Sequence, residues 1–537
     1  MLSATVLLAA GCSGAETNQT SDAGDVAGPG VAENLTIALA ADTGPLNIFL
    51  KDTQGLDGLI YDTLLAPSPY VQEPQPWLAT AVRQVDPSTW EVDIRDDVTW
   101  HDGERFDVDD VVFSFGFFRD APTGTYTHHV SEIPEISEVT ATSPYSLTMS
   151  CAYPCPELGT VTLAFLPIIP EHIWAQVDPA EAKSVTALPI GTGPYELVDY
   201  DITTGYRFEA NPDYFAGEPV VQELVMPVIA DRSAAFTALR AGEIDATTHP
   251  LAPELLDEFS ASDDLEVLQT APLRFSELRL NFERVPFDQP EFRAAVSLAI
   301  DRQQLLDIVG LGQGRPSTQG YPHPDAPFAN PDNSTPYDAE KSAARLDDLD
   351  MVDSDGDGVR EGSEGPLDFV IKVNGGAPSD VRAAELVVED LQEVGIQARV
   401  ETLDAGSIAG LFASRDFDLT IGSLSPHAVA DPTQFIMSHR SGLLWDAPEI
   451  PYPEFDALFE QWRATETVED RLAVLQDMQT LFNAQPTSIP LYYPDEYWAF
   501  RSGNFAGWVE SPGFGIVHKW SLLPPEVGEG IGAVVNR

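Results

Sequence analysis

The chain has 537 residues, 43% of them hydrophobic, so it is long enough for two or three globular lobes and too apolar for a disordered protein. Asp and Glu number 86 against 28 Lys and Arg, which gives a formal net charge of −58. Such a surface repels nucleic acids and anionic lipid headgroups, which argues against both as partners, and it favours a halophilic protein that works where salt screens the self-repulsion.

The N-terminus reads MLSATVLLAAGCSG, an apolar run that ends in small residues and then Cys12. Its end resembles a lipobox, so residues 1–12 are predicted to be a signal peptide and Cys12 its lipidated residue. The run lacks the basic residues that begin a secretory signal, which favours a start upstream of Met1 or a shortened chain. Residues 13–33 are polar and Gly-rich, as in a flexible tether. We therefore expect a lipid anchor on the extracytoplasmic side of the cell membrane, in the periplasm or at the cell surface.

From Asn34 onward, short strand patterns alternate with helical patterns between Pro and Gly residues, which favours α/β lobes. Residues 33–42 are predicted as a strand. Residues 88–100 alternate polar and apolar side chains, which predicts antiparallel pairing with one wet face. Apolar spacing predicts helices at 55–65, 107–120, 291–309, 380–395 and 468–484.

Cys151 and Cys155 lie close together in the Pro-rich segment SCAYPCPE. Outside the cytoplasm such a pair is more often a disulfide than half of a zinc site. Structural zinc takes four ligands, and no second Cys or His pair lies nearby in the sequence. The sequence therefore predicts a disulfide between Cys151 and Cys155.

Residues 353–364, DSDGDGVREGSE, match the calcium loop of an EF-hand. A calcium sensor needs a second helix after the loop, but the following GPLDFVIKV has a strand pattern, so a sensor is not expected. Two interpretations remain open, a structural Ca²⁺ clip at a helix-to-strand turn and a solvated acidic turn. The clip would use the carboxylates of Asp353, Asp355, Asp357 and Glu364 and the carbonyl of Val359.

No catalytic pattern is apparent in the sequence. His101, in the segment WHDGERF, has no nucleophile or second base at a recognisable spacing, and the nearby Gly103 and Asp107 suit a tight turn and a helix N-cap. The chain contains no G-x-S-x-G, P-loop or H-E-x-x-H motif. A binding protein is therefore favoured over the alternative class, a secreted hydrolase with an acidic cleft.

Four long segments follow one another in a specific order. They are PWLATAVRQVDPSTWEVDIRDDVTWHDGERFDVDDVVFSF, GTGPYELVDYDITTGYRFEANPDYF, AAFTALRAGEIDA and LRLNFERVPFDQPEFRAAVSLAIDR. Together they resemble the family 5 solute-binding proteins of ABC transporters, the oligopeptide-, dipeptide- and nickel-binding group. The resemblance covers about residues 34–525, and agreement among many ordered motifs is far more specific than one motif.

The resemblance implies a two-lobed α/β fold of the periplasmic-binding-protein type II, with an extra subdomain on the first lobe. A ligand would be enclosed between the lobes by hinge closure and delivered to the membrane subunits of an ABC permease. A monomer with no required cofactor is expected, and a chemoreceptor adaptor would share the fold. Lobe I would comprise residues 34–66, 190–275 and 490–525, the extra subdomain 67–189, and lobe II 276–489.

Peptide-binding members resemble one another in a Gly-Trp-x-x-Asp stretch whose Asp holds the peptide α-ammonium. Here the corresponding FDLTIGSLSPHAVAD offers Leu424 or Ser425 in place of Trp, and His427 or Ala428 in place of Asp. A dipeptide held by that ion pair is therefore not expected. Oligopeptide remains the first ligand class and oligosaccharide the alternative. The candidate ligand-binding residues are Ser423, Leu424, Ser425, His427, Tyr492, Tyr493, Asn281 and Gln54.

Overall fold

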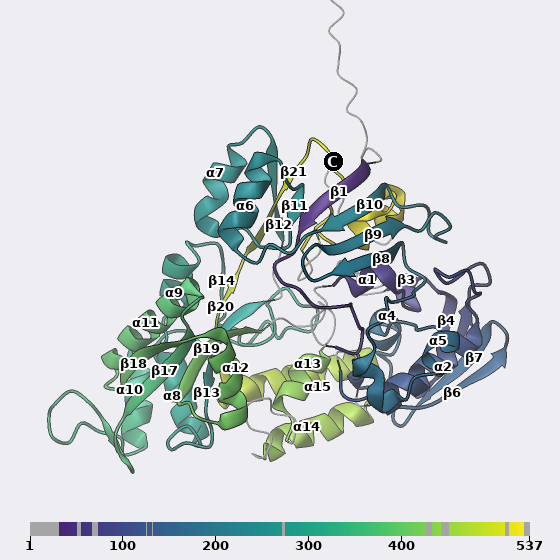
Figure 1. Ribbon diagram of the computed structural model, residues 1–537. Helices are drawn as coiled ribbons and strands as arrows, with labels where there is room; N and C mark the ends of the chain where they lie inside the picture. The colour runs from purple at the N-terminus through teal and green to yellow at the C-terminus, as the bar shows by residue number, and fades with distance from the viewer. Residues whose placement is uncertain are drawn as a thin grey trace, which may run out of the picture.

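The computed structural model describes residues 32–50, 55–66, 74–124, 126–131, 133–270, 274–424, 432–441, 451–510 and 515–530. These residues form a mixed α/β structure around main sheets of seven, six and four strands (Figure 1). The three sheets correspond to lobe I, lobe II and the extra subdomain, so the predicted two-lobed α/β fold is confirmed. Within these ranges, no helix combines the length and the hydropathy needed to cross a bilayer.

Lobe I contains the seven-stranded sheet, in the order β12-β21-β11-β1-β10-β9-β8. Its central strand β1 runs parallel to β10 and β11, so the carboxyl ends of these strands lie at one edge. Helix α6 begins after Asp231, whose side chain accepts a hydrogen bond from the Ala234 N–H. The elements of lobe I are β1 (Ala32–Ala38), α1 (Asp57–Ile60), β8 (Tyr195–Asp201), β9 (Gly205–Ala210), β10 (Val221–Met226), α6 (Arg232–Ala241), β11 (Ala246–Thr247), η2 (Pro253–Leu255), α7 (Leu256–Ser260), β12 (Leu265–Thr270), β21 (Glu496–Arg501), α16 (Lys519–Leu522) and α17 (Pro525–Gly530).

The extra subdomain contains the antiparallel four-stranded sheet β4-β5-β7-β6. Its main helix α2 begins with a reciprocal capping box between Asp107 and Asp110, which confirms the predicted N-cap. The predicted disulfide between Cys151 and Cys155 is present and closes the loop after β7. The elements are β2 (Leu65–Ala66), β3 (Gln75–Pro76), β4 (Ala79–Asp86), β5 (Thr89–Ile94), α2 (Val108–Asp120), α3 (His128–Ser131), β6 (Ile136–Ser143), β7 (Ser146–Cys151), α4 (Thr162–Phe165), α5 (Glu171–Trp174) and η1 (Pro179–Ser184).

Lobe II contains the six-stranded sheet, in the order β14-β20-β13-β19-β17-β18. β17 runs parallel to β18 and β19, whereas β13 is antiparallel to both β19 and β20. The elements are β13 (Phe275–Leu280), α8 (Pro290–Ala299), α9 (Arg302–Val309), β14 (Gly314–Pro316), α10 (Ala339–Asp348), β15 (Glu361–Gly362), β16 (Gly365–Pro366), β17 (Asp368–Asn374), α11 (Pro378–Glu393), β18 (Gln397–Leu403), α12 (Ala405–Ser414), β19 (Leu419–Leu424) and β20 (Ser488–Pro494).

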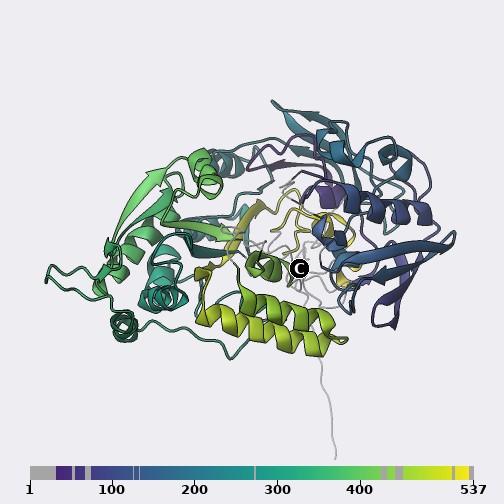
Figure 2. The same cartoon turned by 90° about the horizontal axis from the view of Figure 1, so that it is seen from below.

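Three further helices, α13 (Thr433–His439), α14 (Pro453–Ala464) and α15 (Val468–Ala484), form a helical layer. Figures 1 and 2 both show α14 and α15 reaching from lobe II toward the extra subdomain. The layer is attached to lobe II, because Gln479 of α15 donates to the Phe328 carbonyl at 2.7 Å and accepts from the Asn330 N–H at 2.7 Å. Its aromatic core also includes Phe275 of β13 and Tyr493 of β20. We treat the helical layer as part of lobe II.

Lobe I and the extra subdomain share one hydrophobic core, in which Leu35 of β1 and Val92 of β5 belong to the same buried cluster. A buried polar group joins them as well. The fully buried Asp62 pairs with Lys519 at 2.8 Å. It also accepts hydrogen bonds from Trp77 at 2.8 Å, Tyr214 at 2.9 Å and Thr192 at 3.1 Å. We call these five residues the fixed joint.

The described structure differs from the predicted elements in several places. The helix predicted at 55–65 is only the four-residue α1, and Leu65 already belongs to β2. Residues 291–309 form two helices rather than one, because Ile300 is extended and Asp301 caps α9 through the N–H groups of Gln303 and Gln304. Residues 490–494, assigned to lobe I from the resemblance, belong to β20 and therefore to the lobe II sheet. The chain returns to lobe I only at β21, so the boundary lies at Asp495.

Candidate functional site

The chain crosses between the two large sheets twice, and both crossings join carboxyl edges. β12 ends at the same edge as the carboxyl ends of β1 and β11, and β13 begins beside the carboxyl end of β19. In the return crossing, β20 ends at Pro494 and β21 begins at Glu496 (Figure 1). Ligands of open α/β sheets bind outside the carboxyl ends of the strands. The candidate site therefore lies between these two edges, beside the crossings.

The lobe II edge brings together two of the predicted residues. Ser276 of β13 lies opposite Ser423 of β19 on one side and opposite Tyr492 of β20 on the other. Ser423 is exposed, whereas Tyr492 is buried. Burial, together with the negative charge of Asp380, raises the pKa of Tyr492 to about 12. Tyr492 is therefore a neutral phenol at this edge, and Ser423 offers the hydroxyl that solvent and ligand can reach.

Charged side chains of both signs lie beside these residues. Arg274 precedes β13, and its Nε lies 3.7 Å from the Glu496 carboxylate, across the two crossings. The Arg274 side chain is 49% exposed and that of Glu496 11%. Asp380, in the first turn of α11, is half-buried, and its burial raises its pKa to about 6 although Arg274 acts in the opposite direction. We call Arg274, Asp380 and Glu496 the hinge charge cluster.

The sequence analysis did not identify the hinge charge cluster. Its members lie far apart in the chain, at the start of β13, the start of α11 and the start of β21. Only the pairing of the strands brings them to one place. The one hint in the sequence was that Arg274 stands just before the family-like segment LRLNFERV, in a chain with only 28 Lys and Arg.

The lobe I edge carries a second polar group, after β1. Asp42 accepts hydrogen bonds from the hydroxyl of Tyr200 at 3.0 Å, the hydroxyl of Tyr206 at 2.8 Å and the Gly44 N–H at 2.9 Å. The two tyrosine rings stack with their centroids 4.8 Å apart. Partial burial opposes ionisation of Asp42, but the hydrogen bonds prevail and lower its pKa. Asp42 is therefore a negative group at the rim of lobe I.

Two residues predicted as ligand contacts make hydrogen bonds within lobe II. The Asn281 side chain is buried and donates to the carbonyls of Arg415 at 3.1 Å and Phe417 at 2.8 Å, which fixes the turn before β19. Tyr493 is fully buried, and its hydroxyl donates to the Gly320 carbonyl and to the Pro322 carbonyl. Tyr493 faces the aromatic core of the helical layer, since adjacent residues of a strand point to opposite faces. As ligand contacts, Asn281 and Tyr493 remain predictions.

Other predicted residues cannot be placed. Gln54, Ser425, His427 and Cys12 lie outside the described residues. Leu424 ends β19 and lies opposite Phe275, but its side chain is not among those that the structure describes. These residues remain predictions.

The acidic loop has a different carboxylate set from the predicted one. Asp353, Asp355 and Glu361 have carboxylate oxygens within 4.8 Å of one another. Glu364 instead lies in the turn that joins β15 to β16. The physical reason is that the chain enters a hairpin, in which Glu361 pairs with Val352 and returns to the loop, whereas the helix of an EF-hand would carry the last loop residue inward. Asp357 accepts from the Val359 N–H at 2.8 Å, as in a local turn.

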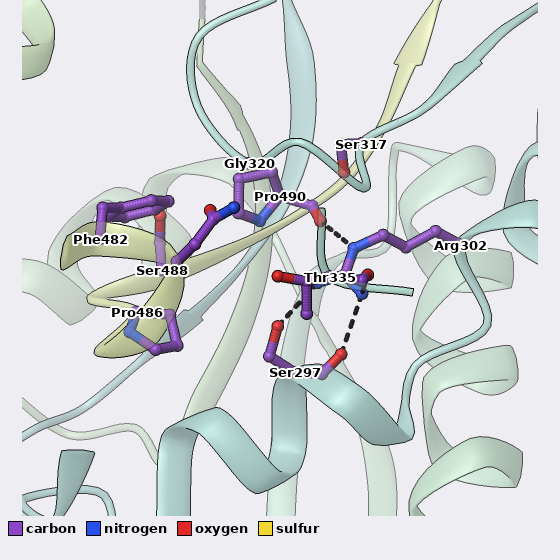
Figure 3. Close-up of a pocket in the computed structure, with 10 residues that line it drawn as sticks. Ser297, Arg302, Ser317, Gly320, Thr335, Phe482, Pro486, Ser488 and Pro490 are labelled. Atoms are coloured by element: carbon purple, nitrogen blue, oxygen red, sulfur yellow. Dashed lines mark hydrogen bonds between the residues drawn. The ribbon is translucent and has the colours of Figure 1, made fainter. Parts of the chain in front are cut away.

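A small hollow lies inside lobe II, behind the sheet (Figure 3). Arg302 points into it and donates to the Pro490 carbonyl at 2.9 Å, the Ser297 carbonyl at 2.9 Å and the Ser297 hydroxyl at 2.8 Å. The hollow has room for about one water molecule at most. Arg302 therefore ties α8 and α9 to β20 and does not form a solute site.

His101 is a structural residue. Its Nδ1 accepts from the Gly191 N–H at 3.2 Å, and its Nε2 lies 2.9 Å from the Gly193 carbonyl, so Nε2 carries the proton. Burial lowers its pKa. The histidine thus connects the WHDGERF turn to the GTGPY segment of lobe I and remains neutral.

Comparisons with known proteins agree with this architecture. A profile of the bacterial extracellular solute-binding proteins, family 5 Middle, matches residues 73–443. The di/tripeptide-binding protein 2 of Pseudomonas aeruginosa is 24% identical over 424 residues, which are 76% of this chain and 77% of that protein. The nickel-binding periplasmic protein of Escherichia coli is 23% identical over 478 residues, 86% of this chain and 89% of that protein.

Solved structures show the same fold. The oligopeptide-binding protein AppA of Bacillus subtilis, in complex with a nonapeptide, has a TM-score of 0.74 at 20% identity, covering 88% of this chain and 95% of that chain. NikA of Brucella suis, in complex with Fe(III)-EDTA, has a TM-score of 0.76 at 22% identity, covering 94% of this chain and 100% of that chain. The chain therefore belongs to the bacterial extracellular solute-binding proteins of family 5, and it is a solute-binding protein of ABC importers rather than an enzyme.

Proposed function

We propose that this protein captures a short peptide between its lobes and delivers it to the permease subunits of an ABC importer. The observation that carries this proposal is the hinge charge cluster, which places Arg274 beside the carboxylates of Asp380 and Glu496 where the two carboxyl edges meet. A free peptide has an ammonium and a carboxylate group. A cluster with charges of both signs can accept both.

Asp380 is the member that favours an ammonium ligand. Burial raises its pKa to about 6, which means that its ionised form is disfavoured in the ligand-free protein. A ligand ammonium placed beside it would offset the desolvation and restore the ionised form. This acid would replace the one missing from the Gly-Trp-x-x-Asp position. An oligosaccharide can donate hydroxyl hydrogen bonds to this carboxylate but carries no positive charge to offset its desolvation.

Calorimetric titration of the full chain with trialanine, N-acetyltrialanine and maltotriose tests the ligand class. We expect trialanine to bind and its N-acetylated form to bind more weakly by about 2 kcal/mol or more, because a charge-assisted contact is lost. Equal binding of the two peptides, or binding of maltotriose alone, would contradict the proposal.

Asp380→Asn tests the anchor itself. The variant should bind trialanine and N-acetyltrialanine with similar affinity. Asp368→Asn is a matched control, because Asp368 lies at the opposite, amino end of β17, exposed beside Arg399 at 3.4 Å. The control should retain the full preference for the free amine. Loss of that preference in both variants would indicate a general charge effect instead.

The pH dependence follows from the same carboxylate. Asp380 has a raised pKa of about 6 in the free protein, and an ammonium ligand would lower it. The affinity for trialanine should therefore be highest between about pH 6 and pH 7.5 and fall as the pH decreases through about 6. It should also fall above about pH 8, where the peptide α-ammonium loses its proton. The Asp380→Asn variant should lose this dependence.

We also propose that Cys12 is lipidated and that the protein works as a monomer on the extracytoplasmic side of the membrane. The net charge of −58 supports a high-salt environment. Cys12→Ala should release the protein into the medium, as followed by fractionation. A mutant that stays fully membrane-bound would contradict the anchor.

A further inference from the structure

The two hinge crossings join lobe I to lobe II, and the extra subdomain makes a separate contact with lobe II away from them. Helix α15 of the helical layer contacts the loop that follows β7 and is closed by the disulfide. Tyr153 of that loop and Ile133 belong to the same buried cluster as Trp462 and Leu475 of the helical layer. Since the extra subdomain shares its core with lobe I, this contact joins the two lobes across the space between them.

A buried ion pair lies at the centre of this contact. Nη1 of Arg471, on α15, is 2.5 Å from a carboxylate oxygen of Glu157. The two side chains are only 5% and 10% exposed. Arg471 also donates to the Pro154 carbonyl through Nη2. Its guanidinium thus contacts both a side chain and the backbone of the extra subdomain.

Aromatic rings surround the cations of this contact. The Arg471 guanidinium lies 3.9 Å from the ring centroid of Trp462 on the helical layer. The guanidinium of Arg463, on α14 of the helical layer, lies 4.5 Å from the ring centroid of Tyr153 in the extra subdomain. Two arginines thus meet the same loop, in a chain that has 28 basic residues against 86 acidic ones. The contact offsets the repulsion between two acidic lobes at the place where they meet.

The energetics of a buried ion pair suit a reversible contact. Desolvation of the two charges cancels much of their attraction, so the intact pair adds little net stability. Removal of one partner is costly, however, because the other charge is left without its counterion in a dry site. If the lobes separate, both charges return to water together. The intact pair therefore permits opening, whereas a half-pair opposes closing.

We propose that Arg471 and Glu157, with Arg463, Tyr153 and Pro154, form a closure latch that holds the extra subdomain against lobe II in the closed protein and breaks when the lobes open. The latch requires movement about the two crossings between the large sheets, beside Arg274 and at Asp495. The latch does not require any particular ligand, so its test is independent of the test of peptide binding.

Small-angle scattering and hydrogen exchange on the ligand-free full chain test the latch. Arg471→Glu should raise the radius of gyration and accelerate exchange of the amides at 151–158 and 462–475 by about tenfold or more, since two carboxylates placed together in a buried contact oppose closing. The double variant Glu157→Arg with Arg471→Glu should shift both readouts back toward the parent. Arg382→Glu, which disrupts an exposed pair with Glu385 on α11, is the matched control and should change neither readout.

Glu157→Gln keeps the side-chain shape and is a milder second variant. This variant should show smaller increases in the radius of gyration and in local hydrogen exchange. Its far-UV circular dichroism should stay parental. The proposal is overturned if Arg471→Glu and Glu157→Gln lower the melting temperature while the radius of gyration and the local exchange stay parental. That result would identify a permanent packing contact rather than one that opens.

Discussion

Two buried ion pairs lie where the extra subdomain meets its neighbours, one beside lobe I and one against lobe II, and they differ in their surroundings. In the fixed joint, Asp62 pairs with Lys519 at 2.8 Å and accepts three further side-chain hydrogen bonds, inside a continuous hydrophobic core. In the closure latch, Arg471 pairs with Glu157 at 2.5 Å between a helix of lobe II and a loop of the subdomain. The first pair can be reached by water only through unfolding. The second can be reached by a hinge motion.

This difference predicts how each pair responds to damage. A charge left alone in the fixed joint has no route to water except loss of the fold. A charge left alone in the latch can be hydrated when the lobes open. Burial is thus similar for the two pairs, and the mobility of the bodies that carry them decides the outcome.

The largest effect is expected at the fixed joint. Asp62→Asn leaves Lys519 buried without its counterion, which should lower the free energy of unfolding by about 3–5 kcal/mol. Guanidinium denaturation measures this loss. The radius of gyration of the folded variant should stay parental. A radius of gyration that increases at guanidinium concentrations below the unfolding transition would mean that the fixed joint also opens.

A smaller effect is expected at the latch. Glu157→Gln should lower the free energy of unfolding by less than Asp62→Asn does, because opening lets Arg471 regain its hydration. The same denaturation experiment compares the two variants directly. Equal losses would remove the distinction between a fixed and a movable pair.

Removal of the disulfide should affect the latch but not the fixed joint. The double variant Cys151→Ser with Cys155→Ser frees the loop that presents Tyr153 and Pro154. By the chain-entropy account, a disulfide that closes a loop this short adds about 2 kcal/mol to the free energy of unfolding. Part of that loss should appear as faster hydrogen exchange at 462–475, on the partner side of the latch. The exchange of residues around Asp62 should not change. Faster exchange at both places would indicate a general loosening of the subdomain.

The smallest effect concerns the acidic loop, which is remote from both joints. If Asp353, Asp355 and Glu361 hold Ca²⁺, free calcium at about five times its Kd should add about 1 kcal/mol of stability at constant ionic strength. Glu361→Gln should erase the gain, whereas Glu364→Gln should preserve it. Thermal unfolding with calcium and with chelator measures the difference. Identical melting in both conditions would favour the solvated acidic turn.

Local features of the fold could be read from the sequence because they depend on neighbouring residues. The N-cap at Asp107 and the disulfide between Cys151 and Cys155 follow from short-range chemistry, and both are present. The ordered motifs were sufficient to identify the family, and the family implied the two lobes and the extra subdomain. The motif residues Thr192 and Tyr214 now have a physical reason, since both donate to Asp62.

Features that depend on pairing between distant segments could not be read in this way. The helix predicted at 291–309 is divided because Asp301 caps a second helix, and residues 490–494 join lobe II because β20 pairs with β13. The carboxylate set of the acidic loop changed from Glu364 to Glu361 because a hairpin follows it instead of a helix. Each of these outcomes was decided by a contact outside the local pattern.

The candidate site shows the same division. The sequence by itself determined the family and the absence of the usual acid from the segment FDLTIGSLSPHAVAD. Only the tertiary structure decided that Arg274, Asp380 and Glu496 meet at the hinge and that Arg471 meets Glu157. In a chain with 86 acidic residues, a carboxylate gains meaning only from its burial and its cationic neighbour, and both are properties of the folded chain.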